Sequence, residues 1–345
     1  MTKAVALLSG GLDSRLAVRV IQEQNIEVLG VNFLTPFFGA SPAVHAAANQ
    51  LGVPLRLLDI TAAHWDVVRH PKYGYGKNMN PCIDCHALMV REAGRLMEES
   101  GADFIITGEV LGQRPKSQNP QALRTVEKES GYPGLVLRPL SARLLPPTLP
   151  EERGQVNRER LLDIAGRSRL RQMELAEKYG ITDYPPPAGG CLLTDPGYSQ
   201  RLRGLLENKP QAEPHEARLL RFGRCFLLSG GAYLAVGRRE EENRVIAAEA
   251  RPADILLTVE DFPGPISLLR LPREVPADIM AGIPALAIRP PEDSPRQGHL
   301  IQQAAAITAR YSDAKNLPRV KVAFWHPGDN PAHLEVEPDF QSRPV

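Results

Sequence analysis

The chain has 345 residues, 43% of them hydrophobic, and a formal net charge of +1 at pH 7. A chain of this length is long for one domain and comfortable for two, and so small a net charge excludes a general electrostatic argument for nucleic-acid binding. We expect a cytoplasmic protein without a membrane span, because no apolar run approaches about 18 residues and a strand-like run begins almost at once, leaving no room for a signal peptide.

The first predicted elements are a strand at residues 4–8 and a helix from residue 15, joined by the sequence Ser-Gly-Gly-Leu-Asp-Ser. The adjacent glycines Gly10 and Gly11 let the backbone turn sharply and bring its N–H groups near a ligand. The start of the helix adds unpaired donors and a positive dipole end. The segment therefore predicts a nest for a phosphate group, and the alternative is a plain glycine turn.

Three side chains of this segment suggest which phosphate chemistry is involved. Ser9 and Ser14 add hydroxyl donors, and no lysine follows as it does in kinase-type loops. The segment contains Asp13 where a kinase-type loop would have a lysine for the phosphates. The carboxylate of Asp13 is suited to bind a Mg²⁺ ion that is itself bound to the phosphates. The segment resembles the pyrophosphatase loop, S-G-G-x-D-S, of enzymes that split ATP between the α- and β-phosphates and adenylate an oxygen of their substrate. A second Ser-Gly-Gly at residues 229–231 lacks the Asp-Ser and lies between two apolar runs, which predicts a hairpin turn.

Strand and helix signals alternate through the first half of the chain. Strands are predicted at residues 4–8, 27–33, 55–60, 103–107 and 135–138, and helices near 43–51 and 85–99. This alternation predicts an α/β fold with a parallel, doubly wound sheet. Ligands bind outside the carboxyl ends of the strands in such sheets. We therefore expect the loop, Phe33 and the segment Thr107-Gly108-Glu109 to converge on one crevice.

The cysteines indicate a second kind of chemistry. Cys82 and Cys85 form a C-x-x-C pair, Cys191 follows a proline- and glycine-rich hinge, and Cys225 lies in an apolar run that predicts a small buried hydrophobe. In a cytosolic protein such a pair points to metal or redox chemistry. Three thiolates around an iron–sulfur cluster leave one iron free for exogenous sulfide. A pair without metal, and a zinc site with His86 as fourth ligand, remain open.

The remaining signals describe the domain organisation. Helices are predicted at residues 158–166, 169–179 and 198–207, and a polar stretch at 208–214 is the linker candidate. We therefore expect a catalytic domain at 1–207, a second, smaller α+β domain at 215–335 and a tail at 336–345. Arginines cluster between residues 138 and 171. Such a cluster usually forms a solvent-exposed face, and the alternative is a contact with RNA.

Several motifs in order resemble those of the tRNA 4-thiouridine synthetases, over roughly residues 3–200. Besides the loop they are Thr-Gly-Glu-Val-Leu-Gly-Gln at 107–113, Ser-Gln at 117–118, Leu-Arg-Pro-Leu at 137–140 and Cys-Leu-Leu-Thr-Asp-Pro at 191–196. The tRNA 2-thiouridylases share the loop and a comparable cysteine. The resemblance implies an adenine nucleotide α-hydrolase-like fold and an ATP-dependent tRNA sulfurtransferase, favouring 4-thiouridine over 2-thiouridine.

The same resemblance implies roles for individual residues. Cys191 corresponds to the thiol that transfers sulfur, and Cys82, Cys85 and Cys191 match the three ligands of a [4Fe–4S] cluster. Asp13 would hold Mg²⁺. The ATP-binding residues would be Ser9, Gly10, Gly11, Asp13, Ser14, Phe33, Thr107, Gly108, Glu109, Gln113 and Gln118.

Two departures from that family affect the expected partners. Only eight residues precede the loop, where the 4-thiouridine synthetases carry an RNA-binding region, and no rhodanese-like domain follows. We expect sulfide or a cysteine-desulfurase-type donor to supply sulfur. The second half is similar to the RNA-binding domain of the NFACT proteins of ribosome quality control, at residues 236–243, 254, 261–265, 309–315 and 320–322. A plain α+β interaction module is the alternative reading of that domain.

The implied reaction has two steps. The uracil oxygen attacks the α-phosphate of ATP and pyrophosphate leaves; a sulfide on the cluster, or a persulfide on Cys191, then displaces AMP from the ring carbon. Two other functions remain open. One is an amide-forming ligase with the same loop, which would not need three cysteines, and the other is a non-catalytic RNA-binding factor that uses ATP only as a ligand.

Overall fold

The computed structural model describes residues 2–186, 191–271 and 295–345, and the chain divides into two compact units, Met1–Asp195 and Pro196–Val345. The division falls before the expected end of the first domain at residue 207. Helix α8 (Pro196–Asn208) is grouped with the second unit. The buried Tyr198 of this helix donates its hydroxyl to the Ala217 carbonyl at 2.7 Å. This packing is the physical reason for the earlier division.

The first unit is built on a parallel sheet of five strands in the order β3-β2-β1-β4-β5. The strands are β1 (Lys3–Leu7), β2 (Glu27–Leu34), β3 (Leu55–Asp59), β4 (Phe104–Ile106) and β5 (Val136–Leu137). All five predicted strands and the doubly wound α/β fold are confirmed. The chain reverses its direction across the sheet between β1 and β4, so the edge above these two strands is the topological switch point.

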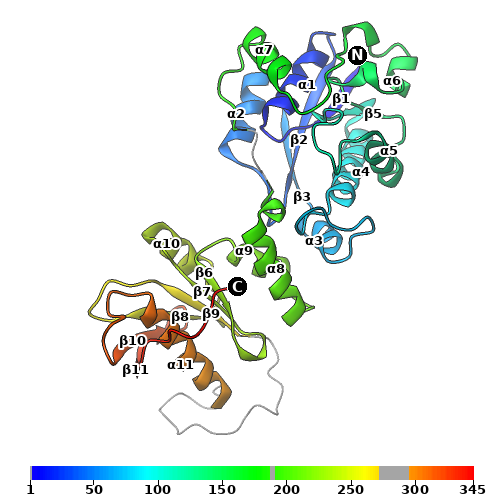
Figure 1. Cartoon of the computed structure of the whole chain (residues 1–345). Coiled ribbons are helices and arrows are strands. Elements are labelled where there is room, and N and C mark those ends of the chain that lie inside the picture. The colour runs from blue at the N-terminus through cyan, green and yellow to red at the C-terminus, as the bar shows by residue number, and fades with distance from the viewer. Residues whose placement is uncertain (1, 187–190, 272–294) are drawn as a thin grey trace. The chain divides into compact units, whose positions relative to one another are not determined.

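Helices cover both faces of this sheet (Figure 1). Val5 of β1 belongs to one apolar cluster while its neighbours Ala4 and Ala6 belong to another, as the two-residue period of a strand requires. The helices α1 (Leu12–Gln22), α2 (Pro42–Leu51) and α7 (Leu170–Lys178) lie on one face, and α4 (Cys82–Ser100) and α5 (Pro120–Ser130) on the other. The helices α3 (Thr61–Arg69), α5 and α6 (Leu149–Glu152) were not predicted.

The helix predicted at residues 158–166 is wrong. Only a short 3-10 turn forms there, at Arg158–Arg160, and the chain then continues without helical structure. Ile164 donates its N–H to the Leu140 carbonyl at 2.8 Å, and the Leu161 and Ile164 side chains are buried in the core. Backbone pairing with the segment after β5 satisfies the polar groups that a helix would have paired internally.

The second unit contains an antiparallel six-stranded sheet in the order β11-β10-β8-β9-β7-β6. The strands are β6 (Arg224–Leu227), β7 (Tyr233–Val236), β8 (Ile255–Val259), β9 (Ser267–Arg270), β10 (Val320–Trp325) and β11 (Ala332–Val336). Its helices, besides α8, are α9 (Pro214–Leu219), α10 (Glu240–Ala248) and α11 (Pro295–Arg310), and α11 packs on the sheet. The predicted hairpin around residues 229–231 is confirmed by the pairing of β6 with β7. No helix in the described part of the chain is long and apolar enough to cross a membrane.

Candidate active site

The loop after β1 forms a tight turn at the carboxyl end of the central strand of the parallel sheet. Gly10 has φ +77°, and a Cβ there would lie 2.9 Å from the carbonyl carbon of Ala43, so the position requires glycine. Ser14 Oγ donates to the Gly11 carbonyl at 2.9 Å and lies 3.2 Å from Ser9 Oγ. Because α1 begins at Leu12, before the expected start, Asp13 and Ser14 belong to its first turn.

Arg15, the residue after the motif, holds this loop to two other segments. Its buried guanidinium donates from Nε to the Gly10 carbonyl at 3.0 Å, from Nη2 to the Ala43 carbonyl at 3.2 Å and from Nη1 to the Asp183 carbonyl at 2.5 Å. Burial lowers the pKa of Arg15. The loop, α2 and the chain that leads toward Cys191 are therefore tied by one cation. Sequence reasoning missed Arg15, although its place directly after the motif was a signal.

The segment after β4 lies against the start of α1. A Cβ on Gly108 would lie 2.5 Å from the backbone nitrogen of Ser14, so the two backbones touch here. Gln113 Nε2 donates to Asp13 Oδ2 at 3.3 Å. Burial raises the pKa of Asp13, and the charge of Arg169 is the main effect that opposes this rise. The loop and the Thr-Gly-Glu segment thus meet at the switch point, where ligands of such sheets bind.

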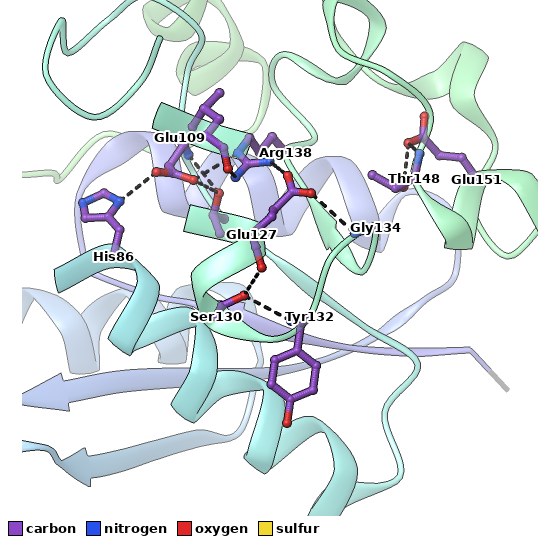
Figure 2. A network of polar contacts seen from close by, with 11 residues as sticks. His86, Glu109, Glu127, Ser130, Tyr132, Gly134, Arg138, Thr148 and Glu151 are labelled. Carbon is purple, nitrogen blue, oxygen red and sulfur yellow. Dashed lines mark hydrogen bonds and ion pairs between the residues drawn. The ribbon is translucent and has the colours of Figure 1, made fainter. Parts of the chain in front are cut away.

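Glu109 forms the centre of a buried polar network that reaches α4 (Figure 2). Its Oε1 lies 2.7 Å from His86 Nδ1, and its Oε2 accepts from Thr107 Oγ1 and from Arg138 Nε, both at 3.1 Å. Burial favours the neutral acid, but the charge of Arg138 and the contact with His86 outweigh it and lower the pKa of Glu109 to about 2. Arg138 also donates to Glu127. Glu109 is therefore ionised and joins the β4 loop to the helix that carries two of the cysteines.

The segments that carry the three predicted thiols are neighbours. Helix α4 begins at Cys82, so Cys82 and Cys85 both lie in its first turn. Asn78 Nδ2, just before that helix, donates to the carbonyl of Thr194, three residues after Cys191, at 2.7 Å. Burial raises the pKa of Cys85 well above its usual range, and the nearby thiols of Cys191 and Cys82 raise it further.

Cys191 is the most distant of these thiols in sequence. It is half-buried, and burial raises its pKa to about 11, with a further contribution from nearby Cys82. The thiol is therefore protonated at neutral pH in this arrangement. Residues 187–190 of the predicted hinge lie outside the described residues. Cys225 is a buried free thiol, as predicted.

His64 of α3 contacts this thiol group and was missed by the sequence analysis. Its Nε2 lies 3.2 Å from Cys85 Sγ, and burial lowers the pKa of His64 to about 4, so the ring is neutral. The rings of Phe37 and Phe38 pack against it, with centroids 5.5 and 5.1 Å away. His86, the alternative zinc ligand of the sequence analysis, contacts Glu109 instead. No sequence signal marked His64, because the helix that carries it was not predicted.

A metal ion or cluster can be tested against these side chains. Three thiols match a [4Fe–4S] cluster in kind and number. Within the described residues, however, no three His, Cys, Asp or Glu side chains are gathered closely enough to hold a metal ion, and all four cysteines are free. The thiols are therefore not gathered around a single ion such as zinc, the predicted cluster stays a prediction, and we derive no step through either.

Two further predicted residues take part in the frame of the site. Phe33 is buried in the apolar cluster that also contains residues of α4. Gln118 is buried, and its carbonyl accepts the N–H of Gly112 at 2.7 Å, which closes the turn that presents Gln113. Gly112 itself has φ +77°. These contacts position the Thr-Gly-Glu segment relative to the loop.

Comparison with known proteins finds partial similarity to proteins that act on tRNA. Residues 1–143 match the family model described as "Thiamine biosynthesis protein (ThiI)". The tRNA-specific 2-thiouridylase MnmA of Listeria monocytogenes serotype 4b (strain CLIP80459) is 25% identical over 255 residues, which cover 69% of this chain and 64% of that protein. The same enzyme of Proteus mirabilis (strain HI4320) is 29% identical over 147 residues, 38% of this chain and 40% of that protein.

One solved structure found by the comparison is the crystal structure of a 4-thiouridine synthetase–RNA complex with bound ATP. It is 23% identical, with a TM-score of 0.34, and the likeness covers 52% of each chain. The chain spans just under two thirds of the length of the Listeria relative and less than half of that of the Proteus relative.

Proposed function

We propose that this chain is an ATP-dependent tRNA sulfurtransferase, which adenylates a uridine carbonyl oxygen and replaces it with sulfur, at the 4-position rather than the 2-position. The observation that carries the proposal is that the glycine loop after β1 and the segments that bear three neighbouring thiols both adjoin the Thr-Gly-Glu segment after β4. The Glu109–His86 contact at 2.7 Å joins the two parts. The family match over residues 1–143 and the similarity to tRNA 2-thiouridylases support the same reaction class.

The adenylation step uses the loop. The N–H groups of Gly10 and Gly11 and the hydroxyls of Ser9 and Ser14 bind the phosphates that leave as pyrophosphate. Donors fixed before the reaction need no reorganisation as charge develops there. Asp13 would hold Mg²⁺, which neutralises charge on the phosphates. The uridine must leave its base stack to reach the crevice, at a cost of a few kcal/mol by analogy with base flipping.

The sulfur-transfer step uses the thiols. A cysteine-desulfurase-type donor first transfers a persulfide sulfur to the Cys191 thiol; this outer sulfur then attacks the activated ring carbon, and AMP leaves. The bond between the two sulfurs must then break: a second thiol attacks the inner sulfur of Cys191, the thiolated uridine leaves, and the disulfide so formed is reduced by an added thiol before the next turnover. Cys82 is half-buried and close to Cys191, whereas Cys85 is buried against His64. We therefore assign the second role to Cys82. If the three thiolates came together around a [4Fe–4S] cluster, it would supply an iron with an open position for sulfide.

The second unit is proposed to bind the tRNA. Arg224 and Arg310 stack on the ring of Tyr311, with distances of 4.4 and 5.0 Å to its centroid. Cations stacked on aromatic rings suit the recognition of unstacked bases. Asp254, one of the residues that resemble the NFACT domain, is instead buried in a bidentate pair with Arg270. We assign that aspartate to the stability of the second unit.

The test is a thiolation assay with the full chain purified without oxygen. With Mg-ATP, unmodified tRNA, a thiol reductant and a cysteine desulfurase that supplies persulfide sulfur from cysteine, the wild type should form AMP and a thiolated nucleoside, identified by mass spectrometry of the digested tRNA. Asp13→Ala should lose both products. Cys191→Ser should lose only the thiolated nucleoside, whereas the control Cys225→Ala should keep both.

Two results would decide between this proposal and other functions. The first result is AMP formation by the wild type without any thiolated nucleoside, together with an equal rate of AMP formation in Cys82→Ser. This result would contradict the sulfurtransferase proposal and favour an amide-forming ligase. Iron and zinc should be quantified in the same preparation. About four irons for each chain, lost in Cys191→Ser, would establish the cluster, and stoichiometric zinc would exclude it.

A further inference from the structure

Arg169 reaches the nucleotide loop from a part of the chain that none of the motifs covers. It is the residue before α7, and its Nη2 lies 3.7 Å from Asp13 Oδ1. The segment leading to it is fixed to the β4 loop, because Ala165 forms a bridge with Leu111 and Gly166 donates to the Leu111 carbonyl at 2.8 Å. The backbone contacts of Ala165 and Gly166 with Leu111 therefore position Arg169 beside the start of α1.

The contact between Arg169 and Asp13 leaves hydrogen-bonding capacity unused. At 3.7 Å it is an ion pair but too long for a hydrogen bond. Arg169 Nε and Asp13 Oδ1 are both buried without a hydrogen-bond partner among the described residues. Gln172, one turn further along α7, is fully buried, and neither of its amide atoms has such a partner either. A buried polar group left unpaired is unfavourable, so the arrangement is complete only with a ligand.

The unused atoms have the geometry that a phosphate needs. Nε and Nη2 lie on one edge of the guanidinium plane, and that edge forms bidentate pairs with phosphate oxygens. Arg169 and Arg114 both act on Asp13 with positive charge, while Gln113 donates to its other oxygen. Two cations facing one carboxylate leave an excess of positive charge at the mouth of the loop. An anion with several oxygens is the ligand that fits.

We propose that Arg169 binds the β- and γ-phosphates of ATP, leaving Asp13 free for Mg²⁺ when the nucleotide enters. This assignment rests on the proposed function, because it assumes that ATP is cleaved between the α- and β-phosphates. Negative charge then develops on the departing pyrophosphate, which lies on the loop beneath Arg169. A guanidinium bound there stabilises the transition state as well as the bound nucleotide.

The experiment compares Arg169→Gln and Arg169→Lys with Arg171→Gln in the full chain. Arg171 is an exposed control on the same helix, paired with Asp163 at 2.7 Å. Binding of Mg-ATP, pyrophosphate and AMP is measured by calorimetry. Arg169→Gln should bind Mg-ATP and pyrophosphate about 10- to 100-fold more weakly and AMP as the wild type does, since AMP lacks the phosphates concerned. Arg169→Lys keeps the positive charge but lacks the planar edge of the guanidinium. Its affinity for Mg-ATP and pyrophosphate should therefore lie between those of the wild type and Arg169→Gln.

Each outcome bears on one proposal. If the wild type binds Mg-ATP and both Arg169→Gln and Arg169→Lys bind it equally well, the proposed role of Arg169 is overturned. The proposed function of the chain is not affected by that result. If both variants bind ATP and AMP more weakly by the same factor, the proposed role of Arg169 is also overturned. Arg169 would then affect only the shape of the site. Wild type that binds no Mg-ATP contradicts the proposed function itself. Thermal melting of each variant against Arg171→Gln shows whether the fold is kept.

Discussion

At the scale of single residues, two glycines determine how closely the loop after β1 meets its neighbours, for different reasons. Gly10 has φ +77°, a conformation that side chains rarely adopt, and it also packs against the backbone of α2. Gly108 is limited by space alone, because an added Cβ would lie 2.5 Å from Ser14 N and 2.7 Å from the carbonyl carbon of Asp13. Both obstacles are backbone atoms, which cannot rotate away.

We expect Gly108→Ala to displace the start of α1 from the β4 loop. Overpacking of this kind costs about 1–3 kcal/mol, and we expect Mg-ATP to bind roughly 5- to 100-fold more weakly, as measured by calorimetry. Gly298→Ala in α11 is the control, because a Cβ there meets no atom within 4 Å. It should leave ATP binding unchanged. Unchanged ATP binding in Gly108→Ala as well would show that the contact between these backbones is dispensable.

At the scale of elements, the ionised Glu109 links the β4 loop to α4. The Glu109 carboxylate has a folded-state pKa of about 2, lower than its usual value of 4.5. A carboxyl group whose pKa is lowered on folding contributes stability above its unfolded pKa, and this contribution is lost as the pH falls through the folded pKa. The contribution, on the order of 3 kcal/mol, should therefore disappear between about pH 5 and pH 2.

The measurement is urea unfolding of wild type and Glu109→Gln from pH 3 to pH 7. We expect the variant to be less stable at pH 7, because Arg138 loses its buried partner. The difference in unfolding free energy should narrow as the pH falls below about 5. Glu174→Gln, an exposed residue of α7, serves as the control and should show no such trend. A difference that stays constant over this range would mean that folding does not lower the pKa of Glu109.

Two elements show how far local sequence signals reach. Helix α5 was missed although its start carries a visible signal: Asn119 caps it, accepting from Ala122 N at 2.9 Å, and Pro120 follows. The opposite error occurred at residues 158–166. The spacing of Leu161 and Ile164, which are both buried, is compatible with one face of a helix and also with an extended segment. Backbone pairing with the chain after β5 produces the extended conformation.

At the scale of the whole molecule, each of the two units has its own sheet and its own apolar core. The nucleotide loop belongs to the first unit. If Mg-ATP binds there, it stabilises that unit by about 2.7 kcal/mol at 100 times its dissociation constant. We expect scanning calorimetry of the full chain to show two unfolding transitions, of which Mg-ATP raises only one. A shift of both transitions together would mean that the units unfold as one.

The sequence by itself determined the strands of the first unit and the glycine turn that follows the first of them, and it marked the cysteines as a separate chemical signal. These features are local: two glycines, an apolar run or a C-x-x-C pair have the same consequence in most surroundings. The strand order β3-β2-β1-β4-β5 was decided only by the tertiary structure, and it places the loop beside the β4 segment.

The tertiary structure also decided the partners of individual side chains. His64 against Cys85, His86 against Glu109 and Arg169 against Asp13 each join residues far apart in the chain. The same packing made three thiols neighbours, although among the described residues they do not form a site for a single metal ion. Such contacts depend on which faces of which elements are buried together, and no short stretch of sequence contains that information.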